Sequence, residues 1–289
     1  MEKKNKKIVL NTEELRVDYH FHANLPRDQK KAEKHIKKYW EKLKEAGINV
    51  LLSTEHVYKN PKRAYEFLDK FKPENTYVIP GMEYVTKEGV DIIIFSRDKS
   101  IYDYEELFPL KMTLDETIDF VKNHNDLYIF VTHPYLKSKT GIVKNLGFSR
   151  FIDLINEVRA VEVVSGNALK QKIFKIYIEI FFKKKKKGDL LRIYLPNNEF
   201  YIERKEFYLK DLDFIAVGSD SHQFGEVGNC LILEYNESED IFEKVINSKK
   251  GKIFVRPRQH TIYSLIKAPI IIGSEALIKK LYKFKIIRK

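Results

Sequence analysis

The sequence predicts an α/β fold built around a largely parallel sheet, and three observations lead to this prediction. Apolar strand-like runs alternate with helical segments between residues 16 and 220, which is typical of strands joined by helical crossovers. The strand-like runs are almost continuously apolar, as in sheets that are buried on both faces. Polar residues of the types that bind metals recur at the ends of these runs. From these patterns alone, a barrel and a doubly wound sheet both stay open.

The spacing of apolar residues predicts each element in turn. Residues 16–21 form the first strand, and residues 27–47 form a helix with apolar residues at every third or fourth position and a capping glycine, Gly47. A helix over 61–71 begins with proline at its first position. A helix over 113–124 opens with the capping box Thr113-x-x-Glu116. The other expected strands are 48–56, 76–85, 89–96, 127–133, 160–166 and 212–220, and a further helix is expected at 149–159.

Residues 169–211 interrupt the alternation and are interpreted as an insertion. They contain a five-lysine run at 183–187, interpreted as a solvated turn, and a hairpin pattern around 196–198. We expect a single domain over 1–289, with a core at 16–229 and a C-terminal extension at 230–289. The insertion and the extension are candidate surfaces for a protein partner, and the sequence indicates no oligomeric state.

Composition narrows the class of protein. The net charge of +12, from 53 basic and 41 acidic residues, favours anionic partners such as phosphates or nucleic acid, although evenly spread lysine also suits a solvated surface. Cys230 is the single cysteine, which excludes an intrachain disulfide and a cysteine-based zinc motif and fits a reducing compartment. The first residues lack an apolar signal region, and the longest apolar stretch, 173–182, is too short to span a membrane. We therefore expect a cytoplasmic protein.

The candidate functional residues lie at or beside the ends of the predicted strands. His20 and His22 lie one residue apart, so in an extended strand they share a face with Asp18, which is interpreted as orienting an imidazole. Burying many imidazoles and carboxylates without partners is costly, and metal ions provide such partners. Three histidines elsewhere are interpreted as surface or capping residues, namely His35, His124 and His260. The other polar residues at or beside strand ends are His56, Glu83, Asp91, His133, Glu162, Asp220 and His222.

Five short motifs in order, "DYHFHA", "TEH", "GMEY", "THP" and "GSDSH", resemble the PHP family, the polymerase and histidinol phosphatase superfamily of metal-dependent phosphoesterases. The resemblance covers residues 16–229. It implies a distorted (β/α)7 TIM-like barrel that binds two or three divalent ions, Zn, Mn or Fe, at the carboxyl ends of its strands. The implied ligand sets are His20, His22, Glu83 and Asp220 for one ion; Glu83, His133 and Asp91 for a second; and His56, His222 and Asp28 for a third. Asp91 departs from the family pattern, where many members have histidine, as does Glu55, where aspartate is more common.

The activity implied by this resemblance is phosphoester hydrolysis by a metal-activated hydroxide, with His133, Asp220 and His222 as catalytic residues. Arg256 and Arg258 are candidates for binding the substrate phosphate. The expected substrate is a nucleotide or another phosphorylated small molecule. A nuclease acting on DNA or RNA is an alternative, favoured by the charge, the lysine run and the hairpin. A non-catalytic, metal-stabilised partner module is a third, disfavoured because no ligand position holds an apolar residue.

Overall fold

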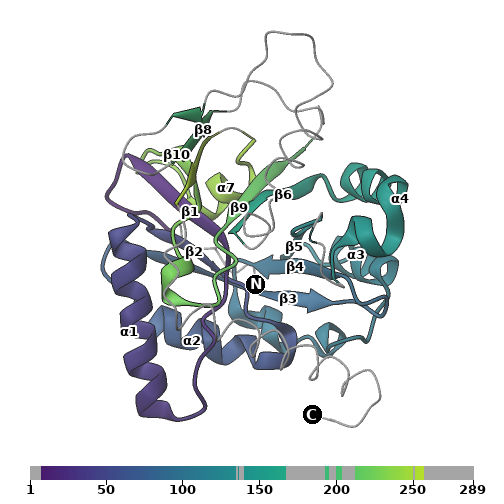
Figure 1. Ribbon diagram of the computed structural model, residues 1–289, viewed down its shortest axis with the longest axis horizontal. Helices are drawn as coiled ribbons and strands as arrows, with labels where there is room; N and C mark the ends of the chain where they lie inside the picture. Colours follow the sequence, from purple (N-terminus) through teal and green to yellow (C-terminus); the bar gives the residue numbers. More distant parts are fainter. Residues whose placement is uncertain are drawn as a thin grey trace, which may run out of the picture.

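The computed structural model describes residues 8–134, 136, 140–166, 193–194, 200–203, 212–249 and 251–256. The described strands form one nine-stranded mixed sheet, in the order β5-β4-β3-β2-β1-β10-β11-β8-β7, and a separate parallel pair, β6-β9 (Figure 1). Within the described ranges, no helix combines the length and the apolar character that a bilayer crossing requires.

The elements follow the predicted order through the first part of the chain. The helices are α1 (Gln29–Glu45), α2 (Pro61–Phe71), α3 (Leu114–Lys122), α4 (Ile142–Val158) and α7 (Ile241–Ile246), with a short 3₁₀ turn, η1 (Val57–Lys59), after β2. The strands are β1 (Glu14–Phe21), β2 (Val50–Ser53), β3 (Tyr77–Val85), β4 (Asp91–Ser96), β5 (Leu127–Phe130), β6 (Ala160–Ser165), β7 (Ile193–Tyr194), β8 (Phe200–Glu203), β9 (Phe214–Gly218), β10 (Cys230–Glu234) and β11 (Lys252–Val255).

Local capping explains why the helices begin and end where they do. Helix α1 is followed by Gly47, whose φ of +70° is left-handed, and the N–H of Ile48 donates to the carbonyl of Leu43 at 2.9 Å. This is the glycine-terminated hydrogen-bond pattern that closes many helices. The capping box at Thr113 and Glu116 is present at the start of α3, as predicted. Both features confirm predictions made from the sequence.

The predicted barrel is wrong. Strands β3 and β4 are antiparallel, because the link at 86–90 is far shorter than the dozen or more residues that a parallel crossover needs. Strand β4 is also antiparallel to β5, and β1 to β10. The parallel pairs among the described strands are β1–β2, β2–β3 and β6–β9. The two sheets meet at isolated parallel bridges, Phe21–Ser221 and Val131–Val161, and do not form a closed ring of parallel strands.

Two hydrophobic cores lie around the larger sheet. The smaller core includes Phe21 and Leu68 and holds residues of α1, at the left in Figure 1, and of α2, in the lower part of the view. The larger core includes Tyr19, whose ring stacks on Phe214 of β9 with centroids 6.1 Å apart. The β1–β2 register shifts between Asp18 and Phe21, so Tyr19 and Phe21 join different cores. The predicted strict alternation therefore fails at the end of β1, where His20 and His22 lie.

The later part of the chain also contributes to the larger sheet. Strands β7 and β8 pair antiparallel, as predicted for a hairpin around 196–198, although 195–199 and the lysine run lie outside the described residues. Strand β10 pairs with both β1 and β11, and β11 pairs with β8. Thus strands from the predicted insertion and from the predicted C-terminal extension lie side by side in one sheet.

Candidate metal centre

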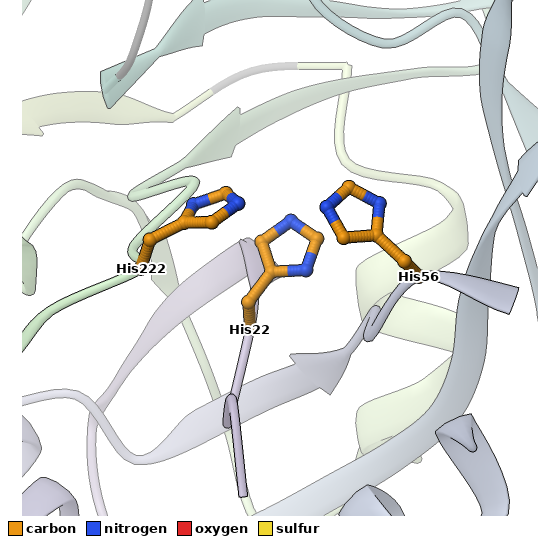
Figure 2. Close-up of side chains that lie close together, drawn as sticks. All are labelled: His22, His56 and His222. Carbon is orange, nitrogen blue, oxygen red and sulfur yellow. The ribbon is translucent and has the colours of Figure 1, made fainter. Parts of the chain in front are cut away.

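Buried imidazoles and carboxylates from distant parts of the chain converge at one end of the larger sheet. Within the described residues, their ligand atoms form three overlapping groups, and the atoms of each group lie within 4.8 Å of one another. Figure 2 shows the rings of one group converging from three different segments of the chain. The groups are His22, His56 and His222; His20, His22 and Asp220; and His20, Glu83 and His133.

The two histidines at the end of β1, His20 and His22, face each other through the same ring atom. The Nε2 atoms of His20 and His22 lie 3.0 Å apart. Two nitrogens bound to one tetrahedral zinc at about 2.0–2.1 Å would lie roughly 3.4 Å apart, so the observed spacing fits a shared ion. The Nδ1 atom of His20 lies 3.2 Å from Glu162 Oε1, and that of His22 lies 3.4 Å from Glu55 Oε1. A carboxylate on the far nitrogen is the usual partner of a metal-binding histidine.

Glu83 lies at the middle of the cluster. Its Oε2 atom is 2.6 Å from His56 Nδ1 and 3.4 Å from His22 Nε2, while its Oε1 atom is 2.9 Å from His133 Nε2. One carboxylate thus touches residues from all three groups. Within the described part of the chain, His133 Nδ1 is buried without a hydrogen-bond partner, a state that costs about 1–3 kcal/mol. Mixed imidazole and carboxylate donors of this kind suit transition-metal ions.

Asp220 closes the cluster from the other sheet. Its Oδ1 atom lies 3.5 Å from His22 Nε2 and 3.6 Å from His222 Nδ1, and its Oδ2 atom accepts a hydrogen bond from Ser165. Asp220 has a φ of +44° and His133 has a φ of +23°. Left-handed backbone is uncommon for residues other than glycine, and such strain gathers at functional sites.

The imidazoles are held in a strongly anionic setting. Burial alone would lower the pKa of His20, but Asp220 and Glu162 hold it well above its usual value. Burial also opposes the charge on His22, yet Asp220 and Glu55 raise its pKa to about 9. Binding a metal here would therefore compete with protonation of these imidazoles.

The pKa values of the carboxylates shift in the opposite direction, below their usual range. Burial would raise the pKa of Asp220, but the charge of His20 and the hydrogen bond from His22 hold it well below its usual range. Burial would also raise the pKa of Glu83, but the charge of His56 and hydrogen bonds from neighbouring imidazoles hold it well below its usual value. Both groups therefore stay ionised at this buried site, as metal ligands must be.

Several residues support the cluster without joining the three groups. Glu162 is fully buried in β6 and accepts hydrogen bonds from Thr132 Oγ1 and from the backbone N–H of His133, both at 2.7 Å. Sequence reasoning placed Glu162 on a strand but gave it no role. Gly218 allows β9 to approach β1, because a Cβ atom there would lie 2.2 Å from the Cβ of His20. A lone carboxylate inside the apolar run "AVEVVS" was the sequence signal for Glu162.

Asp18 does not orient an imidazole, contrary to the prediction. Its Oδ1 atom accepts hydrogen bonds from the backbone N–H groups of His20, at 3.1 Å, and Ser219, at 2.9 Å. Asp18 thus joins the end of β1 to the segment that follows β9. Burial raises its pKa to about 7.

Four predicted site residues are not placed in the cluster. Asp28 is exposed and caps α1 by accepting a hydrogen bond from the backbone of Lys31 at 2.8 Å. Asp91 is buried at the start of β4, where its ligand atoms belong to none of the three groups. Arg256 is half-buried, and a Cβ atom on Gly228 would lie 2.6 Å from its Cδ. The fourth, Arg258, lies outside the described residues.

Comparison with known proteins gives similarity in fold alone. No protein-family model and no curated protein sequence matches the chain. The structure of PsfC from Pseudomonas syringae PB-5123 is 16% identical, has a TM-score of 0.55, and aligns over 96% of this chain and 100% of that one. A structure of Endonuclease Q with a 27-mer duplex substrate containing an abasic lesion is 18% identical, has a TM-score of 0.37, and aligns over 53% of this chain and 43% of that one. The chain therefore shares its overall fold with PsfC, and its buried His, Asp and Glu groups could hold a metal ion.

Proposed function

We propose that this protein is a metal-dependent phosphoesterase. The observation that carries the proposal is the convergence of His20 and His22 through Nε2 atoms 3.0 Å apart, with Glu83 and Asp220 beside them. The order of the five sequence motifs supports the same class of reaction. Divalent ions held by these groups would supply Lewis acidity and activate water for attack on phosphorus.

The chain's own residues have distinct roles in this proposal. Glu83 and Asp220 provide the fixed negative charge that binds two or three cations, and His133 lies against Glu83 at 2.9 Å. His222 has 14% of its side chain exposed, against 6% or less for the other imidazoles of the cluster. It therefore faces the side from which a substrate arrives, and we assign it proton donation to the leaving oxygen.

The proposed substrate is a phosphorylated small molecule, such as a nucleotide. Acidic residues outnumber basic ones among the described residues, so the basic excess of the chain lies outside them. The lysine run and the hairpin tip that favoured a nuclease also lie outside the described residues. The net charge of the described residues therefore does not favour a long nucleic acid, and DNA or RNA cleavage is treated as an outcome of the test.

The test compares substrates on protein reconstituted separately with Zn²⁺, Mn²⁺ and Fe²⁺. The panel holds nucleotides, sugar phosphates, p-nitrophenyl phosphate, its bis-ester, and end-labelled DNA and RNA. We expect hydrolysis of a phosphomonoester that is abolished by a chelator, restored by metal, and insensitive to salt. His22→Ala should abolish both hydrolysis and metal binding.

The matched control is His124→Ala, which removes an imidazole hydrogen-bonded to the carbonyl of Phe120 at 2.6 Å, away from the cluster. It should keep wild-type activity and metal content. Nucleic-acid cleavage that weakens steeply with salt would replace the small-molecule proposal by the nuclease. Metal-loaded protein inert to the whole panel would reject the phosphoesterase and favour the non-catalytic module.

A further inference from the structure

A polar pair lies behind the His20 ring, on the side away from the other ligand atoms. Thr132 Oγ1 lies 3.0 Å from His20 Nδ1, and the two Glu162 oxygens lie 3.2 and 3.4 Å from it. Both side chains are fully buried. Thr132 Oγ1 is also 2.7 Å from Glu162 Oε2, and this bond has a defined direction because an ionised carboxylate only accepts.

The direction of that bond fixes the proton on His20. A threonine hydroxyl has one hydrogen, and here Glu162 receives it. Thr132 Oγ1 can then only accept from His20 Nδ1, and so can the Glu162 oxygens. The Nδ1 atom must therefore bear hydrogen, which leaves the Nε2 lone pair of the neutral ring pointing at His22 and at the cluster.

The same carboxylate reaches a second ligand. Glu162 Oε2 accepts the backbone N–H of His133 at 2.7 Å, at the residue whose φ is +23°. His20 comes from β1 of the larger sheet, His133 follows β5, and Glu162 belongs to β6 of the smaller sheet. One buried side chain thus fixes the ring of one ligand and the backbone of another.

We infer that Glu162, assisted by Thr132, is a positioning residue that sets the His20 tautomer and couples His20 to His133 in metal binding. The inference rests on the proposed metal centre and assigns a role to residues outside its three ligand groups. Glu162 is a positioning residue in this role, because it contacts His20 at Nδ1 and His133 at its backbone N–H.

The isosteric change Glu162→Gln separates this role from simple packing. An amide offers one oxygen in place of two, and the backbone of His133 requires that oxygen. The amide nitrogen then faces His20 Nδ1, where two hydrogens would oppose each other. The ring is expected to move its proton to Nε2, which removes the lone pair that binds metal.

The experiment measures Co²⁺ and Zn²⁺ affinity by chelator competition in wild type, Glu162→Gln, Thr132→Val and Thr132→Ser. The visible spectrum of the Co²⁺ protein and the ¹⁵N chemical shifts of labelled histidine in the Zn²⁺ protein report ligand geometry and tautomer. We expect Glu162→Gln and Thr132→Val to weaken metal binding about 10–100-fold, as for lost partners of other metal-bound histidines, and to alter both spectra. Thr132→Ser keeps the hydroxyl and should restore wild-type behaviour.

The control is Glu157→Gln, which removes a carboxylate of α4 paired with Lys122 at 2.8 Å. It should leave affinity and spectra unchanged. Wild-type affinity and an unchanged His20 tautomer in both Thr132→Val and Glu162→Gln would overturn the inference; Thr132→Val decides alone if Glu162→Gln does not fold. A wild type that binds Co²⁺ but hydrolyses nothing rejects only the phosphoesterase, whereas a wild type that binds no Co²⁺ rejects the metal centre and the inference together.

Discussion

The two ends of the larger sheet arrange their charged side chains in opposite ways. At one end, the metal-centre cluster turns imidazole nitrogen toward imidazole nitrogen, with His20 and His22 3.0 Å apart. At the other end, which we call the Asp240 cluster, Arg97 binds Asp240 in a bidentate pair at 2.9 and 3.0 Å. Asp240 also accepts the backbone N–H groups of Ile8 and Glu243, both at 3.1 Å.

The difference indicates that one end serves metal binding and the other serves stability. In the Asp240 cluster, the charge of Asp240 is balanced by Arg97 and by two backbone N–H groups, and these bonds join the end of β4, α7 and the segment before β1. In the proposed function a cation would complete the metal-centre cluster, which also holds left-handed backbone at His133 and Asp220. Changes at one end should therefore alter metal binding, and changes at the other should alter stability alone.

The largest expected effect comes from Asp220→Asn. Asparagine matches aspartate in shape and tolerates the left-handed φ of +44°, but it lacks the charge that binds a cation. We expect metal content to fall and kcat/KM for the phosphomonoester to drop by roughly 10³-fold, equivalent to about 4 kcal/mol. Metal analysis and steady-state kinetics check this, with Asp240→Asn as the control. Full activity in Asp220→Asn would remove this residue from the centre.

Metal removal should produce the next effect. A ligand at 1,000 times its dissociation constant stabilises the folded state by about 4 kcal/mol, so a chelator should lower the free energy of unfolding by that amount. Urea titrations with and without chelator measure the loss. Asp240→Ala should show the same loss, because its cluster holds no ion. If chelation left the wild-type curve unchanged, the buried imidazoles would have to be interpreted as structural.

Gly218→Ala tests the close approach of β9 to β1. The new Cβ would lie 2.2 Å from His20 Cβ and 2.7 Å from Glu162 Oε1, so the strands must separate. Overpacking of this kind costs about 1–3 kcal/mol, and the shift of His20 should also weaken metal binding. Gly89→Ala is a suitable control, since its φ of +85° brings strain with no atom of the described residues within 4 Å. Equal metal affinity in both variants would contradict the role of Gly218.

The smallest effect belongs to the Asp240 cluster. Asp240→Ala removes the cap of α7 and a partly exposed ion pair, which should destabilise the protein by about 1–2 kcal/mol without changing metal affinity. Burial alone would raise the pKa of Asp240. The hydrogen bonds from Arg97 and the backbone outweigh this effect, so the pKa lies below its usual value.

The stabilisation from Asp240 is therefore present above the ordinary aspartate pKa and is lost as pH falls through the lower, folded-state value. Urea titrations of wild type and Asp240→Asn should converge in acid, while exposed Glu237→Ala should match wild type throughout. A metal-affinity change in Asp240→Ala would show that the two ends are coupled.

Much of the secondary structure could be predicted, because its signals are local. The apolar period of α1, the capping box at Thr113 and the proline at position 61 all appear in the folded chain. The barrel prediction failed because apolar runs do not reveal strand direction. The five residues at 86–90 did contain the signal, since so short a link permits an antiparallel hairpin and no crossover.

Part of the candidate site could likewise be predicted from local sequence motifs, and part could not. The ordered strand-end motifs located His20, His22, His56, Glu83, His133, Asp220 and His222, which the structure brings together. Asp28 belongs to none of the three groups and caps α1, because a polar residue before a helix serves equally well as its cap. The role of Glu162 depends on how the smaller sheet approaches β1, and no local pattern encodes that approach.

The Asp18–Ser219 hydrogen bond joins positions 201 residues apart, and it has a consequence for folding order. Strand β1 also pairs with β10, which lies even further along the chain than Ser219. Contacts of such long range form slowly, because a large loop must close first. In the proposed function, metal binding should therefore follow the closure of this loop, because the site needs both of its halves in place.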